Sequence, residues 1–243
     1  MKKLITILFL IPLTLFAQQK KDIVHETGTI ITTVFTPKKI YLFSDGRTTK
    51  FGTDSIMSNT RNKIFKISKS CALLTAGIKI PGIDSSVILL CKKNNSIYAD
   101  EIVKQVHDYL TEYWKRFSFY NQGTEYLKNV RIFVFVCGYD SLNNQREYFL
   151  DNMSDIPFTI QEHQISYLNQ NIVYSTMGGD NSTALLSNYL TQNTKNNNSK
   201  LSIDWIIRKS FDEVKDKISQ TDIGIGGRTF EVIITKDNYF EIK

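Results

Sequence analysis

The residues Gly28-Thr29-Ile30-Ile31-Thr32-Thr33-Val34 open the stretch that decides the fold. After Pro37-Lys38-Lys39 the chain continues as Ile40-Tyr41-Leu42-Phe43-Ser44-Asp45-Gly46-Arg47-Thr48-Thr49. Both stretches are rich in β-branched and aromatic residues, which favour strands, and a proline opens the short segment between them. The sequence therefore predicts an antiparallel hairpin formed by residues 29–36 and 40–45.

Strands and helices alternate in groups along the rest of the chain. A second strand pair is predicted at residues 63–68 and 71–76. Helices are predicted at 83–92, 98–117, 182–190 and 203–218, and further strands at 131–137, 147–150, 172–176, 230–235 and 239–242. Each sheet must bury one face, and the helices come in pairs. We therefore expect one domain with an α+β fold, a four-layer αββα sandwich in which two antiparallel sheets lie between helix layers.

Composition and charge exclude several classes of protein. The chain has 243 residues, 42% of them hydrophobic, so it is neither fibrous nor disordered. Its net charge of +6 includes no dense basic tract, which indicates a solvated surface and no nucleic-acid partner. Cys71, Cys91 and Cys137 lie in apolar runs, so we expect small buried side chains there. We expect neither a metal nor another cofactor.

The N-terminus has the residue order of a secretory signal peptide. Lys2 and Lys3 precede an uncharged apolar run at residues 4–16, and Ala17 follows. The run is shorter than the roughly 20 residues that a membrane-spanning helix needs, and no cysteine follows it to carry a lipid. We expect a signal peptide at residues 1–17, export to the periplasm or the medium, and no membrane anchor after cleavage.

The first hairpin and the strand pair behind it strongly resemble the start of a proteasome β-subunit. The resemblance extends over residues 28–34 and 40–49, and over 62–68 followed by 72–77. Three later stretches are also similar, Cys137-Gly138-Tyr139-Asp140, Met177-Gly178-Gly179 and residues 222–227. The chain thus resembles the N-terminal nucleophile (Ntn) hydrolase superfamily, as a secreted bacterial-type member. In this superfamily the peptide bond before a Thr is cut, and that Thr then serves as nucleophile and base.

The resemblance implies a role for particular residues, and two intervals make it specific. The family's catalytic Asp lies sixteen positions after its nucleophilic Thr, as Asp45 does after Thr29, and Gly28 stands at the processing position. The interval of fourteen from the family's catalytic Lys to its oxyanion glycine is met by Lys63 and Gly77. Thr32 fails, because only thirteen positions separate it from Asp45 and Ile31 precedes it. The remaining catalytic position, an Asp in the loop before the last strands, corresponds to Asp222.

General chemistry agrees with these roles. A threonine hydroxyl is a weak nucleophile and needs a base, which a free α-amino group on the same residue supplies. An ammonium from Lys63 would favour the neutral amine, and Asp45 would hold that lysine in place. The Gly77 N–H would stabilise the oxyanion, and Asp222 would orient the amine. Taken singly, each residue has an ordinary alternative, such as a strand threonine, a turn pair at Asp45-Gly46 or a turn glycine.

The sequence leads to a primary expectation and two alternatives. We expect a threonine-nucleophile amide hydrolase of the peptidase type, spanning residues 29–243 and activated by autolysis of a propeptide at residues 18–28. Its substrates would be peptides or proteins. It would work either as a homo-oligomer, a ring or a smaller assembly, or as a single chain. The alternatives are a catalytically inactive scaffold of the same fold and a small-molecule amidase. The family has serines at two positions that are not serine here. The first corresponds to Met177 or Gly178, and the second to Ile225, which favours reduced activity.

Overall fold

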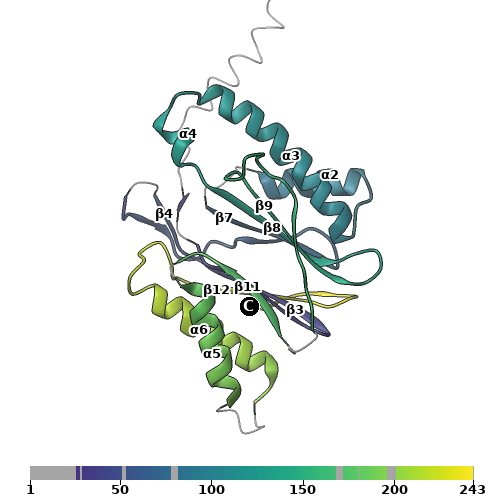
Figure 1. The fold of residues 1–243 in the computed structure, drawn as a ribbon, viewed down its shortest axis with the longest axis vertical. Coiled ribbons are helices and arrows are strands. Elements are labelled where there is room, and N and C mark those ends of the chain that lie inside the picture. Colours follow the sequence, from purple (N-terminus) through teal and green to yellow (C-terminus); the bar gives the residue numbers. More distant parts are fainter. Residues whose placement is uncertain are drawn as a thin grey trace, which may run out of the picture.

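The strands of the first predicted hairpin lie inside a five-stranded antiparallel sheet. The computed structural model describes residues 26–27, 29–50, 53–77, 82–167, 172–179, 181–195 and 201–242, and Figure 1 labels the elements. β2 (Ile31–Thr36) and β3 (Lys39–Asp45) pair antiparallel, so the predicted hairpin is confirmed. The sheet has the order β11-β2-β3-β12-β13, completed by β11 (Val173–Met177), β12 (Thr229–Ile234) and β13 (Tyr239–Ile242).

A second five-stranded antiparallel sheet has the order β10-β9-β8-β7-β6. β6 (Ile64–Lys66) pairs with β7 (Cys71–Gly77), which confirms the second predicted strand pair. The remaining strands are β8 (Ile132–Tyr139), β9 (Gln145–Asp151) and the short β10 (Gln161–His163). Lys63 therefore directly precedes a strand of this sheet, whereas Asp45 ends a strand of the other.

The two five-stranded sheets face each other across a buried apolar cluster. The cluster takes Ile31 and Phe35 from β2 and Leu74 and Phe135 from the second sheet. Full burial of one such aliphatic or aromatic side chain contributes about 1.5–3 kcal/mol. This apolar contact holds the end of β3 close to the start of β6, where the candidate site lies.

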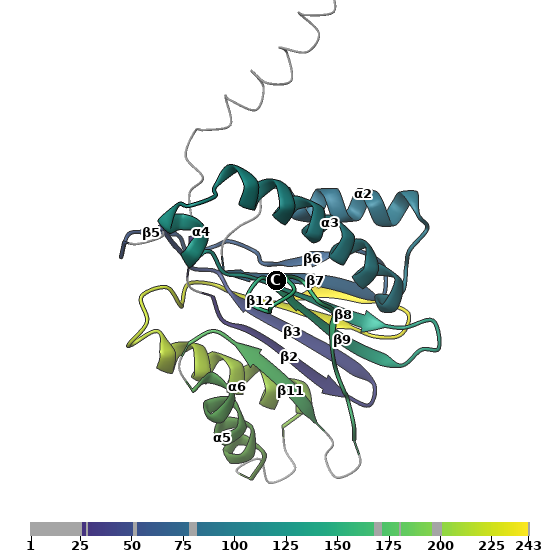
Figure 2. The ribbon, with the colours of Figure 1, turned by 45° about the horizontal axis from the view of Figure 1, so that its top comes forward.

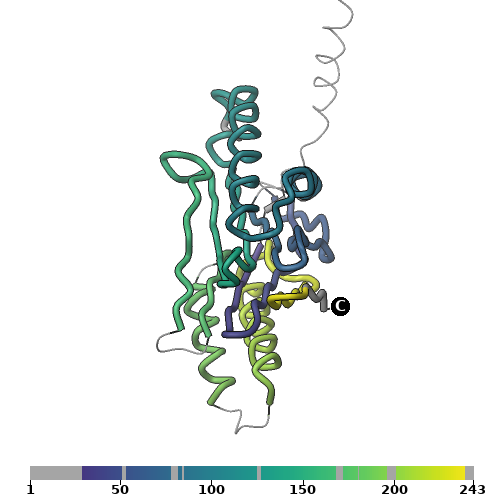
Figure 3. The backbone as a smooth tube through the Cα atoms, turned by 90° about the vertical axis from the view of Figure 1, so that its right-hand side faces the viewer, coloured from purple at the N-terminus to yellow at the C-terminus, as the bar shows by residue number. Residues whose placement is uncertain are grey.

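Two pairs of helices cover the outer faces of these sheets (Figure 2). α2 (Ile83–Lys93) and α3 (Ala99–Tyr120) share a buried cluster with β8, and the short α4 (Glu125–Asn129) precedes that strand. α5 (Ser182–Lys195) and α6 (Ile203–Ile218) share another with β2 and β3. Figure 3 shows the two helix pairs at opposite ends of the molecule. None of the helices in the described ranges is long and apolar enough to cross a membrane.

The expected four-layer αββα sandwich of two sheets is wrong, because the described strands form three antiparallel sheets. The third consists of β1 (Glu26–Thr27), β4 (Thr48–Lys50) and β5 (Ile56–Ser58) in the order β1-β4-β5. It arises because β4, at a place where no strand was predicted, pairs both with β5 and with β1, the segment before Thr29. The fold is therefore loosely α+β, dominated by antiparallel sheets.

Two further expectations concern the cysteines and the N-terminal segment. Cys71, Cys91 and Cys137 are free and buried, as the apolar runs predicted. Burial raises the pKa of the Cys71 thiol well above its ordinary value, so this side chain behaves as a small apolar group. The expected signal peptide at residues 1–17 lies outside the described residues, as does the expected propeptide at residues 18–28, apart from Glu26–Thr27.

Candidate active site

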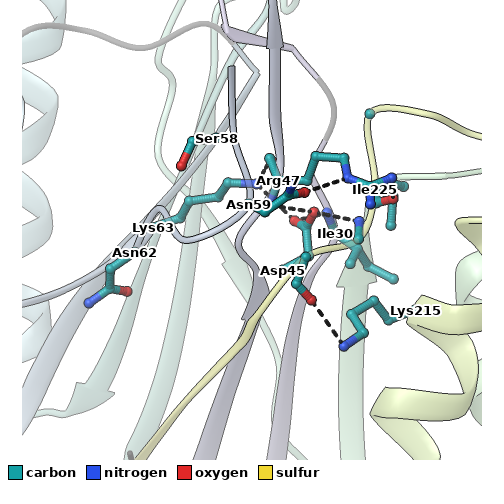
Figure 4. Close-up of polar contacts among 12 residues, drawn as sticks. Ile30, Asp45, Arg47, Ser58, Asn59, Asn62, Lys63, Lys215 and Ile225 are labelled. Atoms are coloured by element: carbon teal, nitrogen blue, oxygen red, sulfur yellow. Dashed lines mark hydrogen bonds and ion pairs between the residues drawn. The ribbon is translucent and has the colours of Figure 1, made fainter. Parts of the chain in front are cut away.

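A buried ion pair joins Asp45, at the end of β3, to Lys63, just before β6. Lys63 Nζ lies 2.8 Å from Asp45 Oδ1, and the two side chains are 5% and 0% exposed. The same Nζ donates a 2.8 Å hydrogen bond to the carbonyl oxygen of Arg47. In Figure 4, Lys63 reaches toward Asp45 and Arg47 from the opposite sheet. The structure thus brings together two of the predicted site residues.

Hydrogen-bond donors surround the carboxyl group of Asp45. Oδ1 accepts the Ile30 N–H at 3.0 Å as well as the lysine, and Oδ2 accepts the Gly226 N–H at 2.9 Å and the Arg47 N–H at 3.3 Å. Burial raises the pKa of Asp45 above its ordinary value, and the charge of Lys63 opposes that rise. Because every one of these partners donates, the arrangement suits the ionised carboxylate, which only accepts.

Thr29 is held next to this ion pair through its neighbour in the chain. The Ile30 N–H donates to Asp45 Oδ1, and the Asp45 N–H donates to the Ile30 carbonyl at 3.2 Å. These two bonds fix the backbone immediately after Thr29, which is itself 8% exposed. The predicted processing residue, Gly28, lies outside the described residues. The role of Thr29 as nucleophile stays a prediction.

Gly178 packs directly on the backbone of Thr29. Its φ is +105°, and a Cβ built there would overlap the carbonyl oxygen of Thr29. Position 178 therefore requires glycine for two reasons, the positive φ and the close approach. Met177, which precedes it and is the alternative match to this serine position, packs against the apolar cluster between the sheets. Neither supplies a hydroxyl group.

Gly77 ends β7 with a φ of +80°, and a Cβ there would overlap the carbonyl oxygen of Arg131. The strand that it ends contacts β1, so the segment just before Thr29 runs near β7. Gly77 is consequently another position at which only glycine fits without strain. The use of its N–H for an oxyanion stays a prediction.

Asp222 shapes the loop that reaches the ion pair. Its carboxylate accepts the Gly224 N–H at 2.8 Å, and its carbonyl accepts the Ile225 N–H at 3.2 Å. This turn delivers Gly226, whose N–H binds Asp45 and whose carbonyl accepts the N–H groups of Gly46 and Arg47. Asp222 acts on the site through its loop in this structure, and a direct contact with the amine of Thr29 stays a prediction. Ile225 is fully buried and offers only its backbone.

Arg47 is a site residue to which sequence reasoning assigned no role. Its Nε donates to Asn59 Oδ1 at 2.9 Å, and its Nη1 donates to the carbonyl of Ile225 at 3.1 Å (Figure 4). The guanidinium also packs against Gly226, where a Cβ would lie 2.9 Å from Cζ. Arg47 thus joins the loop after β3 to the loop before β12. Its place two residues after Asp45 is the only sequence signal.

No protein-family model matches the chain, and the search of curated proteins found no match. Among the described residues there is also no group of three or more His, Cys, Asp or Glu side chains arranged to hold a metal ion. The site offers a buried ammonium, a carboxylate that holds it, and a threonine whose next residue in the chain, Ile30, binds that carboxylate.

Proposed function

We propose that this chain is a threonine-nucleophile amide hydrolase, activated by cleavage between Gly28 and Thr29. The observation that carries the proposal is the buried Asp45–Lys63 ion pair, whose carboxylate also binds the N–H of the residue after Thr29. A buried ion pair is seldom the most stable choice for an apolar core, because both charges lose their hydration. A functional reason for keeping one here is to place a cation beside the Thr29 backbone.

In the proposed reaction, the free α-amine of Thr29 takes the proton of its own Oγ while Oγ attacks the substrate carbonyl carbon. The C–N bond then breaks, and the leaving amine receives that proton. Water hydrolyses the resulting ester and regenerates the threonine. A free α-amine has a reference pKa of about 7.7–8.0. The nearby Lys63 charge would lower this pKa further, so that more of the amine is neutral and able to accept a proton at neutral pH.

The pairing of β1 with β4 supports the proposed autolysis. Thr27 pairs with Thr49 and Glu26 with Lys50, so the chain just before Gly28 is extended and anchored. Thr29 Oγ would attack the Gly28 carbonyl, the peptide bond to the Thr29 nitrogen would break, and water would cleave the ester. The products are a carboxylate on Gly28 and a free amine on Thr29. A glycine before the nucleophile suits the sharp bend that this attack needs.

The proposed substrates are peptides or proteins. Departure of residues 26–27 would leave the edge of β4 unpaired, and an extended peptide binds such an edge through its backbone. We also propose an exported enzyme, because of the N-terminal residue pattern, and a homo-oligomer as one possible assembly. Turnover of peptide amides compared with small acyl amides separates a peptidase from a small-molecule amidase.

A catalytically inactive scaffold is the second candidate function. It is favoured by Gly178 and Ile225, which provide no hydroxyl where the resembled family has serines. Those hydroxyl groups would complete the hydrogen bonds around the amine. Without these hydroxyl groups we expect the proposed enzyme to react slowly but not to be inactive, because Thr29, Asp45 and Lys63 are still present.

Labelling the purified protein tests the enzymatic proposal. The reagent is a peptide electrophile that must react with both the hydroxyl and the amine of one N-terminal threonine. We expect one adduct per chain, retained by Thr32→Ala and lost in Thr29→Ala. If the Thr29→Ala variant is still labelled, Thr29 is not the nucleophile. If protein that begins at Thr29 is not labelled, the inactive scaffold is favoured.

A further inference from the structure

A second buried polar cluster lies between the two sheets, centred on Glu147 of β9. This residue is 1% exposed, although it faces an apolar core. Its Oε1 accepts hydrogen bonds from Thr33 Oγ1 on β2 at 2.5 Å and from Ser175 Oγ on β11 at 2.8 Å. The Cys137 thiol also approaches Oε1, at 3.9 Å. Glu147 therefore belongs to one sheet and is bound by hydroxyl groups of the other.

His163 on β10 binds the second oxygen of the same carboxylate. Its Nδ1 lies 2.5 Å from Glu147 Oε2, and its side chain is 43% exposed. The imidazole thus lies between a buried acid and the solvent. None of these residues belongs to the chemistry proposed for Thr29.

A cavity of about 300 Å³ opens beside this cluster. Its apolar walls are Phe135, Phe149 and Met177. The ring centroids of the two phenylalanines lie 4.9 Å apart. Its polar lining comprises Glu147, Gln161, Glu162, His163, Ser175 and Thr176. A concave, partly apolar cavity with a few convergent polar groups is the usual form of a small-molecule site.

The charges around the cavity select the ligand. The described residues that line it include two carboxylates, those of Glu147 and Glu162, and the imidazole of His163, but no lysine or arginine. Arg146 pairs with Glu162 from outside the lining, at 2.5 Å. A carboxylate has about four acceptor positions. Thr33, Ser175 and His163 occupy three on Glu147, and the weakly donating Cys137 thiol approaches the carboxylate as well, at 3.9 Å. The two acids outnumber the one lining group that can be cationic, His163, so the cavity favours a cation over an anion, and the two aromatic walls suit a cation.

We infer that this cavity binds an organic ammonium ion with a compact apolar body. The body lies against Phe135, Phe149 and Met177, and the ammonium donates to Glu147 and to the oxygen of Ser175. The cavity uses none of the residues proposed for Thr29 chemistry. A result that excludes ammonium binding therefore does not bear on the proposed hydrolase activity, and the reverse also holds.

Three probes with the same aromatic body test the inference: 2-phenylethylammonium, 2-phenylethanol and phenylacetate. They are titrated into the full chain carrying Thr29→Ala, so that processing cannot change the sample, with binding followed by calorimetry and by the NMR signals of His163. We expect the ammonium to bind at least tenfold more tightly than the alcohol, phenylacetate to bind most weakly, and the His163 signals to shift. Equal binding of ammonium and alcohol, a preference for phenylacetate, or no shift at His163 with 10 mM ammonium overturns the inference.

Variants locate the site. Glu147→Gln should weaken ammonium binding at least tenfold, and Glu162→Gln, at the rim, by a few-fold. The matched control is Glu112→Gln, an exposed acid on α3 that pairs with Arg116, which should change nothing. If Glu147→Gln does not fold, the three probes titrated into the chain that carries only Thr29→Ala still test the inference. Equal affinity for the ammonium in folded Glu147→Gln contradicts the inference.

Discussion

Lys63 and Asp45 lie eighteen positions apart in the sequence and on different sheets, yet their charged atoms are 2.8 Å apart in a nearly solvent-free environment. Removing one partner leaves the other as an uncompensated buried charge. Such a loss typically destabilises a protein by about 3–5 kcal/mol, far more than the loss of a surface pair.

Lys63→Met is therefore expected to lower the free energy of unfolding by about 3–5 kcal/mol. The double variant Lys63→Met with Asp45→Asn should regain part of this loss, since no bare charge remains. Urea denaturation of the single and double variants measures both effects. A single variant that loses less than about 1 kcal/mol would mean that water reaches the pair.

Gly178→Ala is expected to destabilise the protein by several kcal/mol, because the new Cβ overlaps the Thr29 carbonyl and φ is +105°. Gly123→Ala is the matched control: its φ is +77°, but nothing lies within 4 Å of the new Cβ. Only the backbone strain applies there, on the order of 1–2 kcal/mol. Thermal unfolding compares the two variants, and equal losses would show that the contact with Thr29 is loose. For the same steric reason, Gly178→Ser should not improve activity.

Arg47→Ala should slow the proposed processing at Gly28 without unfolding the chain. The variant loses the bonds to Asn59 and Ile225 that hold the Gly226 loop against Asp45. Processing is followed by mass during expression and refolding. Arg116→Ala removes an arginine from an exposed pair on α3 and should process at the normal rate. Equal processing by the two variants would remove Arg47 from the site.

The pH dependence of stability should report on His163. The hydrogen bond to Glu147 raises the pKa of His163 above its ordinary value of 6.5, although partial burial opposes the rise. The folded state then holds a proton that the unfolded state releases, so this contribution is fully present below pH 6.5. It is lost as the pH rises through the folded-state pKa. The difference in unfolding free energy between the unaltered protein and His163→Gln should therefore shrink above pH 6.5, and a difference that grows with pH would contradict the assignment.

The sequence predicted the regular parts of the fold because their side chains alternate or repeat over many residues. Residues 31–45 form the expected hairpin, and residues 203–218 form the expected helix. The third sheet was missed because β4 and β5 are three residues each and carry no alternating pattern, with Ile56 and Met57 exposed. Strands this short are defined by their partners, which the local sequence does not reveal.

The candidate site divides in the same way. The expectation that Asp45 holds Lys63 agrees with the ion pair in the structure, whereas the catalytic roles of the two residues stay predictions. The contribution of Gly226 could not be predicted, because it acts through backbone groups brought in from 181 positions away. Glu147 did leave a signal, since it lies two residues before the core-facing Phe149 in β9 and therefore on the same face of the strand, and a charged residue at an inward position needs a partner.

The mass of the purified protein tests the central claim most directly. A hydrolase that activates itself at Gly28–Thr29 yields a mature chain that begins at Thr29, and Thr29→Ala yields a longer chain that keeps Gly28. Thr29→Ser should still be cleaved, because it retains the hydroxyl group. A mature chain that begins at Gln18, in the unaltered protein as in Thr29→Ala, would contradict the proposed activity.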